Sequence, residues 1–206
     1  EKRNLYIISF FQLIEKNAEY LIMKILKDNS TYQFSISEKA ILSVLLSHLC
    51  FIGNRKSMEI ASNFTFSNIM TIKMIGLNAY IKSKNNQSLA FLNKFYKEFS
   101  DNSLVVEKWF GMMASHNFKK NGLESVKSLL KNKKFNYKNP NLVRAILVSF
   151  QKNNIELFHS NDESGYNFVT NQIIKIDKLN PQISSRIILP FSRFSNYKIE
   201  RQKKIK

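Results

Sequence analysis

The sequence predicts an all-α fold. Apolar residues recur at intervals of three and four positions, and no alternation of apolar and polar residues lasts long enough to indicate a sheet. Only five Gly and three Pro interrupt the 206 residues, so short loops are expected between the helices, and short loops favour antiparallel neighbours. No exact repeat period is visible. We therefore expect antiparallel helix pairs stacked into a superhelix, a solenoid of the HEAT or armadillo type, forming one domain over residues 1–206.

The individual helices follow from the spacing of apolar residues. The first expected helix covers 5–26, and its apolar face begins at Leu5 and passes through Ala18 and either Leu21 or Ile22. The other stretches with helical spacing are 37–52, 55–62, 67–81, 88–99, 103–115, 122–130, 139–150, 165–179 and 180–190. These are helices of ordinary length for a globular protein.

Capping residues mark three of the helix starts. Ser35 followed by Glu38 forms a capping box, and Gly53 ends the helix that this box opens. Asn139 and Asn180 each stand directly before a Pro. Because the first N–H of a helix has no intrahelical partner, Pro is tolerated there, and the preceding Asn is a strong N-cap.

The chain is strongly basic, with 32 Lys and Arg against 15 Asp and Glu, a net charge of +17 and a pI near 9.9. Such a charge ordinarily suggests a nucleic-acid partner. However, 26 of the basic residues are Lys and only six are Arg, the residue that makes bidentate contacts to bases and phosphates. With 24 Asn as well, the composition is typical of A+T-rich coding. We interpret the lysines as solvating residues and expect no nucleic-acid partner.

One modest lysine cluster stands out from this background. Its members are Lys119, Lys120, Lys127, Lys131, Lys133, Lys134 and Lys138.

No catalytic or metal-binding motif is visible. The three histidines, His48, His116 and His159, are far apart and lack the spacing that places two ligands on one helix face. His48 lies on an apolar face and is expected at the edge of the core. The single cysteine, Cys50, cannot form an internal disulfide, and we expect a buried thiol in a reducing compartment. We expect no catalytic residue and no metal ligand in the chain.

Two neighbouring acidic residues are interpreted as structural. Asp162 and Glu163 lie in an expected loop, where they are expected to cap the next helix rather than act as an acid–base pair.

No run of about 18 apolar residues is present, so we expect no membrane span and no contact with a membrane. Nothing at the start has the pattern of a signal peptide.

Four blocks in the second half resemble the C-terminal domain of bacterial aminopeptidase N, a zinc metallopeptidase family. They are DNSLVVEKWF at 101–110, NPNLVRAILVSF at 139–150, FHSNDESGY at 158–166 and NPQISSRIILP at 180–190. The first half is similar more loosely, through KAILSVLLSHLCFIGN at 39–54 and FTFSNIMTIKMIGLNAY at 64–80. The resemblance covers essentially the whole chain.

This resemblance implies a function for the domain as part of a larger enzyme. In the family, the last domain is a helical superhelix that packs over the zinc-containing catalytic domain and closes the cavity where N-terminal amino acids are removed from peptides. The H-E-x-x-H motif and the other catalytic segments lie in earlier domains and are absent from this sequence. The implied partners are that catalytic domain, in cis or in trans, and peptide substrates. Zn²⁺ would be bound outside this chain, in a cytoplasmic enzyme.

The resemblance also assigns three site residues. Arg144, Gln182 and Arg186 match family positions that line the substrate channel beyond the scissile bond. Gln182 and Arg186 are four residues apart and share one helix face. A guanidinium can bind carbonyl or carboxylate oxygens of a peptide. The alternative is that the arginines pair with acidic residues of a neighbouring domain or extend into solvent.

The remaining expectations concern the core and the chain ends. Trp109 and Phe110 are expected in the core. The chain starts at Glu1 and ends in RQKKIK, where the family usually continues into one or two further helices, so we expect a piece of a longer protein. A second interpretation is a non-enzymatic helical-repeat scaffold for a protein or RNA partner, with the lysine cluster as its contact surface. A third is the remnant of an eroding gene.

Overall fold

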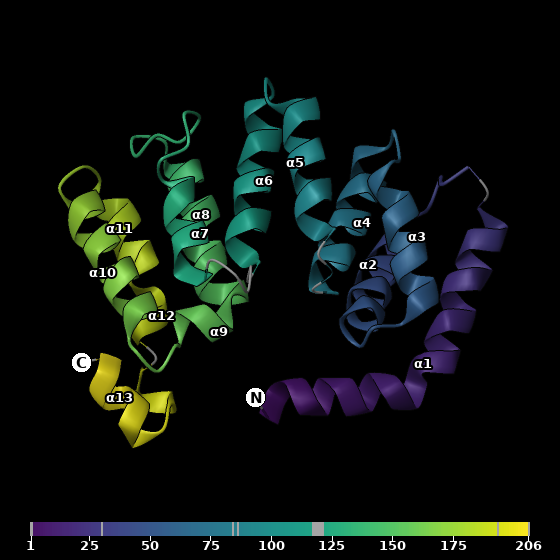
Figure 1. Ribbon diagram of the computed structural model, residues 1–206, viewed down its shortest axis with the longest axis horizontal. Coiled ribbons are helices and arrows are strands. Elements are labelled where there is room, and N and C mark those ends of the chain that lie inside the picture. The colour runs from purple at the N-terminus through teal and green to yellow at the C-terminus, as the bar shows by residue number, and fades with distance from the viewer. Residues whose placement is uncertain are drawn as a thin grey trace. The chain divides into compact units, whose positions relative to one another are not determined.

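The computed structural model describes residues 2–29, 31–83, 85, 87–116, 122–192 and 194–205, with side chains from residue 5 onward (Figure 1). The regular elements in these ranges are helices, and no strand occurs among them. The all-α fold that the sequence predicts is therefore confirmed. The chain divides into two compact units, Glu1–Lys94 and Phe95–Lys206.

Helices from the first half of the chain form the first unit. They are α1 (Lys2–Asp28), α2 (Ile36–Phe51), α3 (Arg55–Thr65), α4 (Met70–Lys82) and the first part of α5 (Ser88–Phe99). α4 packs against both α2 and α3, and α1 packs against α2. At Gly76 the helices α3 and α4 approach so closely that a Cβ would lie 2.6 Å from the Ala61 carbonyl oxygen and 2.6 Å from the Phe64 Cβ. Only glycine fits this position.

α1 presents one apolar face to the core of this unit. Phe11, Ala18, Ile22 and Ile25 are buried there. The prediction that Ala18 lies on the buried face is confirmed. Of the two alternatives at the next turn, Leu21 and Ile22, the buried residue is Ile22. At the start of the helix the expectation is wrong, because Leu5 is 61% exposed. Apolar residues occupy several faces of α1, so spacing alone did not define which of them meets α2.

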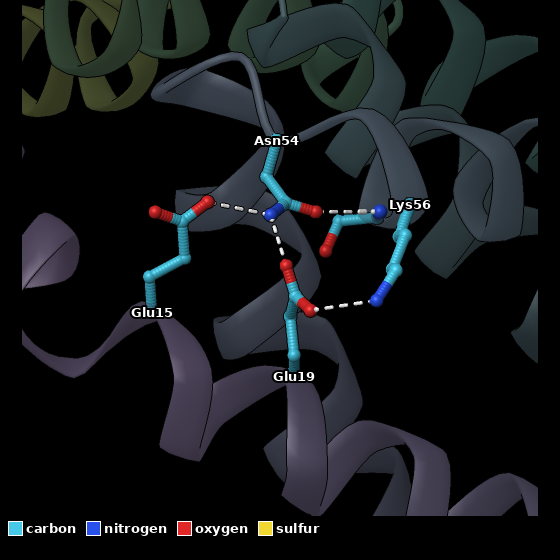
Figure 2. A network of polar contacts seen from close by, with 5 residues as sticks. Glu15, Glu19, Asn54 and Lys56 are labelled. Carbon is cyan, nitrogen blue, oxygen red and sulfur yellow. Dashed lines mark hydrogen bonds and ion pairs between the residues drawn. The ribbon is translucent and has the colours of Figure 1, made fainter.

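A polar network fixes α1 against the start of α3 (Figure 2). Asn54 is the N-cap of α3, and its Oδ1 accepts a hydrogen bond from the Ser57 N–H at 2.8 Å. Its Nδ2 donates to Glu15 Oε1 at 2.6 Å and to Glu19 Oε1 in a short contact. Lys56 Nζ lies 3.3 Å from the other Glu19 oxygen. One buried amide thus satisfies the helix terminus and two carboxylates of a different helix.

The second unit contains the rest of the helices. They are the end of α5, α6 (Ser103–Ser115), α7 (Gly122–Leu129), α8 (Pro140–Asn153), α9 (Ile155–Phe158), α10 (Ser164–Asp177), α11 (Pro181–Ile187), α12 (Leu189–Ser192), the 3-10 helix η1 (Phe194–Asn196) and α13 (Ile199–Ile205). α6 packs on α8, and α10 packs on α11. Trp109 and Phe110 of α6 are buried, as the sequence predicts. Their rings lie 5.0 Å apart between centroids, and they contribute to the core of this unit.

The predicted caps at the starts of α2, α8 and α11 are confirmed, and most helix bounds lie within a few residues of the expected ones. Ser35 and Glu38 form the capping box at α2, and the Asn139 and Asn180 side chains cap α8 and α11. α4 begins later than expected, because the Ser67 hydroxyl accepts a hydrogen bond from the Ile69 N–H and holds a turn there.

The C-terminal third differs more from the prediction. α11 ends at Ile187 instead of continuing to Pro190, since Pro190 has no N–H to bond to the carbonyl four residues earlier. The short helices α9 and α12 and the helix α13 were not predicted. α13 is held in place by Lys204 Nζ, which donates to the Asn161 carbonyl at 2.6 Å, and by Gln202 Nε2, which donates to the Tyr197 carbonyl at 2.7 Å. Both contacts are made by side chains that a periodicity analysis treats as solvated.

Candidate functional site

Arg144 lies on α8, whose start is fixed by Asn139. The Asn139 side chain accepts hydrogen bonds from the Asn141 and Leu142 N–H groups at 2.9 and 3.4 Å. The buried face of α8 packs on α6, and Arg144 is half-buried beside that face. Its Nη2 donates to Asn141 Oδ1 in a short contact. Within the described residues, no carboxylate lies at ion-pairing distance from this guanidinium.

Gln182 and Arg186 lie on α11 and are both exposed. The opposite face of this short helix is buried through Ile183, Ser184 and Ile187. The Ser184 hydroxyl donates to Asp177 Oδ1 at 2.5 Å, which ties α11 to the end of α10. The structure therefore places Gln182 and Arg186 on one exposed helix face, and no carboxylate of the described part of the chain pairs with Arg186.

α8 and α11 are joined by a residue that the sequence analysis did not single out. Gln151 is buried, and its Nε2 donates to the Ile187 carbonyl at 3.0 Å. Because Gln151 follows Arg144 by two helical turns, both lie on the side of α8 that faces α11. The Gln151 Oε1 is buried and has no hydrogen-bond partner among the described residues. The sequence did contain a signal for this contact, because the polar residue Gln151 stands at a position whose helical spacing matches that of the buried residues of α8.

These positions give the site its chemical properties. Arg144 and Arg186 carry guanidinium groups that no described carboxylate neutralises, on two helices that contact each other in the same unit. Such groups can donate paired hydrogen bonds to carbonyl or carboxylate oxygens. No measured distance links Arg144 to Gln182 or Arg186, so their common role stays a prediction.

The histidines make structural contacts. His48 is stacked on Phe11 with ring centroids 4.3 Å apart, and its Nδ1 lies 2.8 Å from the Val44 carbonyl oxygen. The expectation that His48 lies at the edge of the core is confirmed. His159 Nδ1 lies 2.5 Å from the Tyr166 hydroxyl. Burial, with a smaller contribution from the positive charge of Arg201, lowers the pKa of His159 from 6.5 to about 4.

Other candidate reactive groups are also engaged. Cys50 is fully buried, and burial raises the pKa of its thiol to about 12, as expected for a core thiol. Asp162 Oδ1 accepts hydrogen bonds from the Ser164 N–H at 3.1 Å and from its hydroxyl at 2.8 Å. Hydrogen bonds from Ser160 and Ser164 lower the pKa of Asp162 to about 2. The expected capping role holds for Asp162 and is wrong for Glu163, whose side chain makes no capping bond.

The described residues do not fit a metal site. Over the ranges that the structure describes, no group of three or more His, Cys, Asp or Glu side chains could hold a metal ion. No helix found in those ranges is long and apolar enough to cross a membrane.

The lysine cluster is partly paired. Lys119 and Lys120 lie outside the described residues. Lys127 Nζ lies 2.6 Å from Glu124 Oε1, and Lys134 Nζ lies 3.9 Å from Asp101 Oδ1. The other members of the cluster are exposed and extend from the end of α7 into the loop before α8.

Comparisons with known proteins identify the fold and the relatives of the chain. Aminopeptidase N of Haemophilus influenzae is 29% identical over 177 residues, which are 86% of this chain and 20% of that protein. Aminopeptidase N of Escherichia coli is 31% identical over 147 residues, which are 71% of this chain and 17% of that protein. The chain thus spans about a fifth of the length of the curated relatives it matches.

A solved structure contains the same fold as this chain. The crystal structure of Legionella pneumophila aminopeptidase A in complex with aspartic acid superimposes with a TM-score of 0.80 and 22% sequence identity. The match covers 98% of this chain and 25% of that chain.

The family comparison covers both compact units. Residues 11–206 match the family described as "Domain of unknown function (DUF3458_C) ARM repeats", which agrees with the expected armadillo type of helical repeat. The resemblance to the C-terminal helical domain of aminopeptidase N that the four sequence blocks indicate is confirmed by the relatives. The chain belongs to the DUF3458_C family of ARM-repeat domains.

Proposed function

We propose that this chain is the C-terminal helical domain of a zinc-dependent aminopeptidase that removes N-terminal amino acids from peptides. The observation that carries the proposal is the 29% identity to an aminopeptidase N over 86% of the chain, a length that extends into both compact units. The domain, residues 1–206, packs over the catalytic domain and closes its cavity. Its partners are that catalytic domain and the peptide substrate.

The zinc ion belongs to the catalytic domain in this proposal. When bound, zinc supplies a polarised water for attack on the peptide carbonyl. The single thiol, Cys50, is buried and unpaired, in keeping with a cytoplasmic enzyme.

In the proposed enzyme, Arg144, Gln182 and Arg186 line the substrate channel. The exposure of Gln182 and Arg186 on one face of α11 supports this role, as does the lack of a described carboxylate partner for either arginine. Their hydrogen-bond donors would bind backbone carbonyls or the terminal carboxylate of the peptide beyond the bond that is cleaved. A substrate of one amino acid and a small leaving group does not reach these residues.

The test compares two substrates in the full-length enzyme. Arg186→Ala is expected to lower kcat/KM for a tetrapeptide by about tenfold, the loss of roughly 1.4 kcal/mol of binding. It is expected to leave kcat/KM for a single-residue p-nitroanilide within about twofold.

Arg55→Ala is the matched control, because Arg55 is an exposed arginine at the start of α3. Equal losses for both substrates in Arg186→Ala would exclude the channel role. Full-length protein without any aminopeptidase activity when loaded with zinc would exclude the enzyme itself.

A further inference from the structure

A groove lies between α7 and α10 in the second unit. Its volume is about 680 Å³, and its lining comes mainly from those two helices. The groove is distinct from the positions of Arg144, Gln182 and Arg186, none of which lines it. The function proposed above assigns no role to this groove.

The α7 side of the groove combines apolar and cationic residues. Leu123 and Lys127 line it from α7, and Leu130 and Lys131 line it from the turn directly after that helix. Lys131 is exposed, and Lys127 is half-exposed while it contacts Glu124.

The α10 side carries a row of exposed polar residues. Asn167, Asn171 and Lys175 are each four residues apart and all line the groove. Four residues of helix rise about 6 Å, which is close to the roughly 6.6 Å between every second residue of an extended peptide. A carboxamide carries both a donor and an acceptor, so it can bond to a peptide N–H and C=O at once.

One end of the groove disfavours nucleic acid. Lys175 Nζ lies 3.8 Å from the centroid of the Tyr137 ring, and the Tyr137 hydroxyl donates to Gln172 Oε1 at 2.8 Å. The one aromatic side chain at this end is therefore engaged on a face that a base would need for stacking.

We propose that the α7–α10 groove binds an acidic polypeptide segment in an extended conformation. Asn167 and Asn171 hydrogen-bond to its backbone, and Lys127, Lys131 and Lys175 pair with its carboxylates. Lys127, Lys131 and Lys175 place three ammonium groups against Asp162 in the lining and Glu124, which contacts Lys127. With the net charge of +17 of the chain, this excess gives the groove its preference for acidic over basic peptides.

The test uses the 206-residue chain and a fluorescein-labelled decapeptide of alternating Glu and Ser, with binding measured by fluorescence anisotropy. The double variant Lys127→Glu and Lys131→Glu is expected to weaken binding by about tenfold or more. The matched control is Lys133→Glu with Lys138→Glu, which changes the net charge equally at exposed positions outside the groove. The control is expected to change binding by less than about threefold.

A second variant addresses the carboxamides and does not depend on charge. Asn171 is exposed on α10, so Asn171→Ala leaves the fold intact and is expected to weaken binding by about fivefold. Far-UV circular dichroism of every variant checks that its helix content is unchanged.

Three results would overturn the proposal. The first is no saturable binding of the Glu–Ser peptide at about 1 mM chain. The second is an equal loss in the control double variant, which means that only the net charge attracts the peptide. The third is tighter binding of a ten-nucleotide oligothymidylate that the groove variants abolish, which assigns the groove to nucleic acid instead.

Discussion

The Gln151 side chain and the Ile187 backbone share a buried hydrogen bond that connects the last turn of α8 to the last turn of α11. Removal of the amide leaves the Ile187 carbonyl buried without a partner. Gln151→Ala is therefore expected to lower the free energy of unfolding of the Phe95–Lys206 unit by about 2–3 kcal/mol. Urea unfolding followed by the fluorescence of Trp109, the one tryptophan of the chain, measures this change.

The control for this variant is Lys152→Ala, since Lys152 is the exposed neighbour on the same helix. It is expected to change the unfolding free energy by less than about 0.5 kcal/mol. If Gln151→Ala is as stable as Lys152→Ala, the bond does not hold α11 against α8.

Asn54 tests the network between α1 and α3 in the Glu1–Lys94 unit. Asp is as good an N-cap as Asn, so Asn54→Asp retains the bond to the Ser57 N–H. However, it places a third carboxylate beside Glu15 and Glu19. It also removes the amide group that donates a hydrogen bond to each of them. We expect Asn54→Asp to lower the free energy of unfolding by about 1–3 kcal/mol, measured by urea unfolding and circular dichroism.

Asn63→Asp is the matched substitution at an exposed position of α3. The loss in Asn54→Asp should shrink at low pH, where repulsion involving the introduced carboxylate weakens. A loss that does not depend on pH would mean that charge repulsion is not its cause.

Gly76 is expected to tolerate no side chain. A Cβ there would lie 2.6 Å from the Ala61 carbonyl oxygen, which belongs to the backbone of α3 and cannot rotate away. Gly76→Ala is therefore expected to lower the unfolding free energy by about 2–3 kcal/mol, despite the higher helix propensity of Ala. The comparison is Gly111→Ala, where the Cβ would lie 3.3 Å from the Ser149 hydroxyl, a side-chain atom that can move. Thermal unfolding of both variants should show a clear loss in the first and little change in the second.

His159 gives the Phe95–Lys206 unit a pH dependence. Its folded pKa of about 4 lies below the ordinary value of 6.5, so the unfolded chain takes up a proton at a pH where the folded chain does not. Stability is therefore expected to fall as the pH drops from about 6.5 to about 4. The groups that face His159 are the Tyr166 hydroxyl, the Tyr197 ring and the positive charge of Arg201.

His159→Gln keeps a hydrogen-bonding side chain and removes the titration, so its urea midpoint should change less between these pH values. If the urea midpoint changes equally between pH 6.5 and 4 in His159→Gln and in the parent, another group is responsible.

Asp162 affects stability at lower pH than His159 does. Its folded pKa of about 2 is below the ordinary value of 3.8, so its stabilisation is lost only as the pH falls from about 3.8 to about 2.

The sequence predicted the elements whose signals are local. Ser35, Asn139 and Asn180 each bond to backbone groups two or three residues away, so their caps depend on few neighbours. The apolar face of α1 was harder to predict, because Leu5 and Leu13 suit a helix as well as Phe11 does. Leu13 is nevertheless 85% exposed, because packing on α2 decides which face is buried.

Contacts between distant segments had no signal in the spacing of residues. Gln151 and Ile187 are 36 positions apart, and Lys204 and Asn161 are 43 positions apart. The proposed channel residues Arg144, Gln182 and Arg186 came from the resemblance to aminopeptidase N and not from physical reasoning. The α7–α10 groove needed the structure, since its residues lie on two helices that the sequence does not place side by side.

The buried position of Cys50 also makes the opening equilibrium of the first unit measurable. A thiol reagent cannot reach a sulfur that is fully enclosed, and a pKa of about 12 leaves almost no thiolate to react. Modification thus requires the helices around it to separate. Under conditions where closing is faster than chemical reaction, the rate of modification divided by that of a free thiol gives the equilibrium constant for opening. Applied at increasing urea concentration, this ratio distinguishes local separation of α2 from unfolding of the whole Glu1–Lys94 unit.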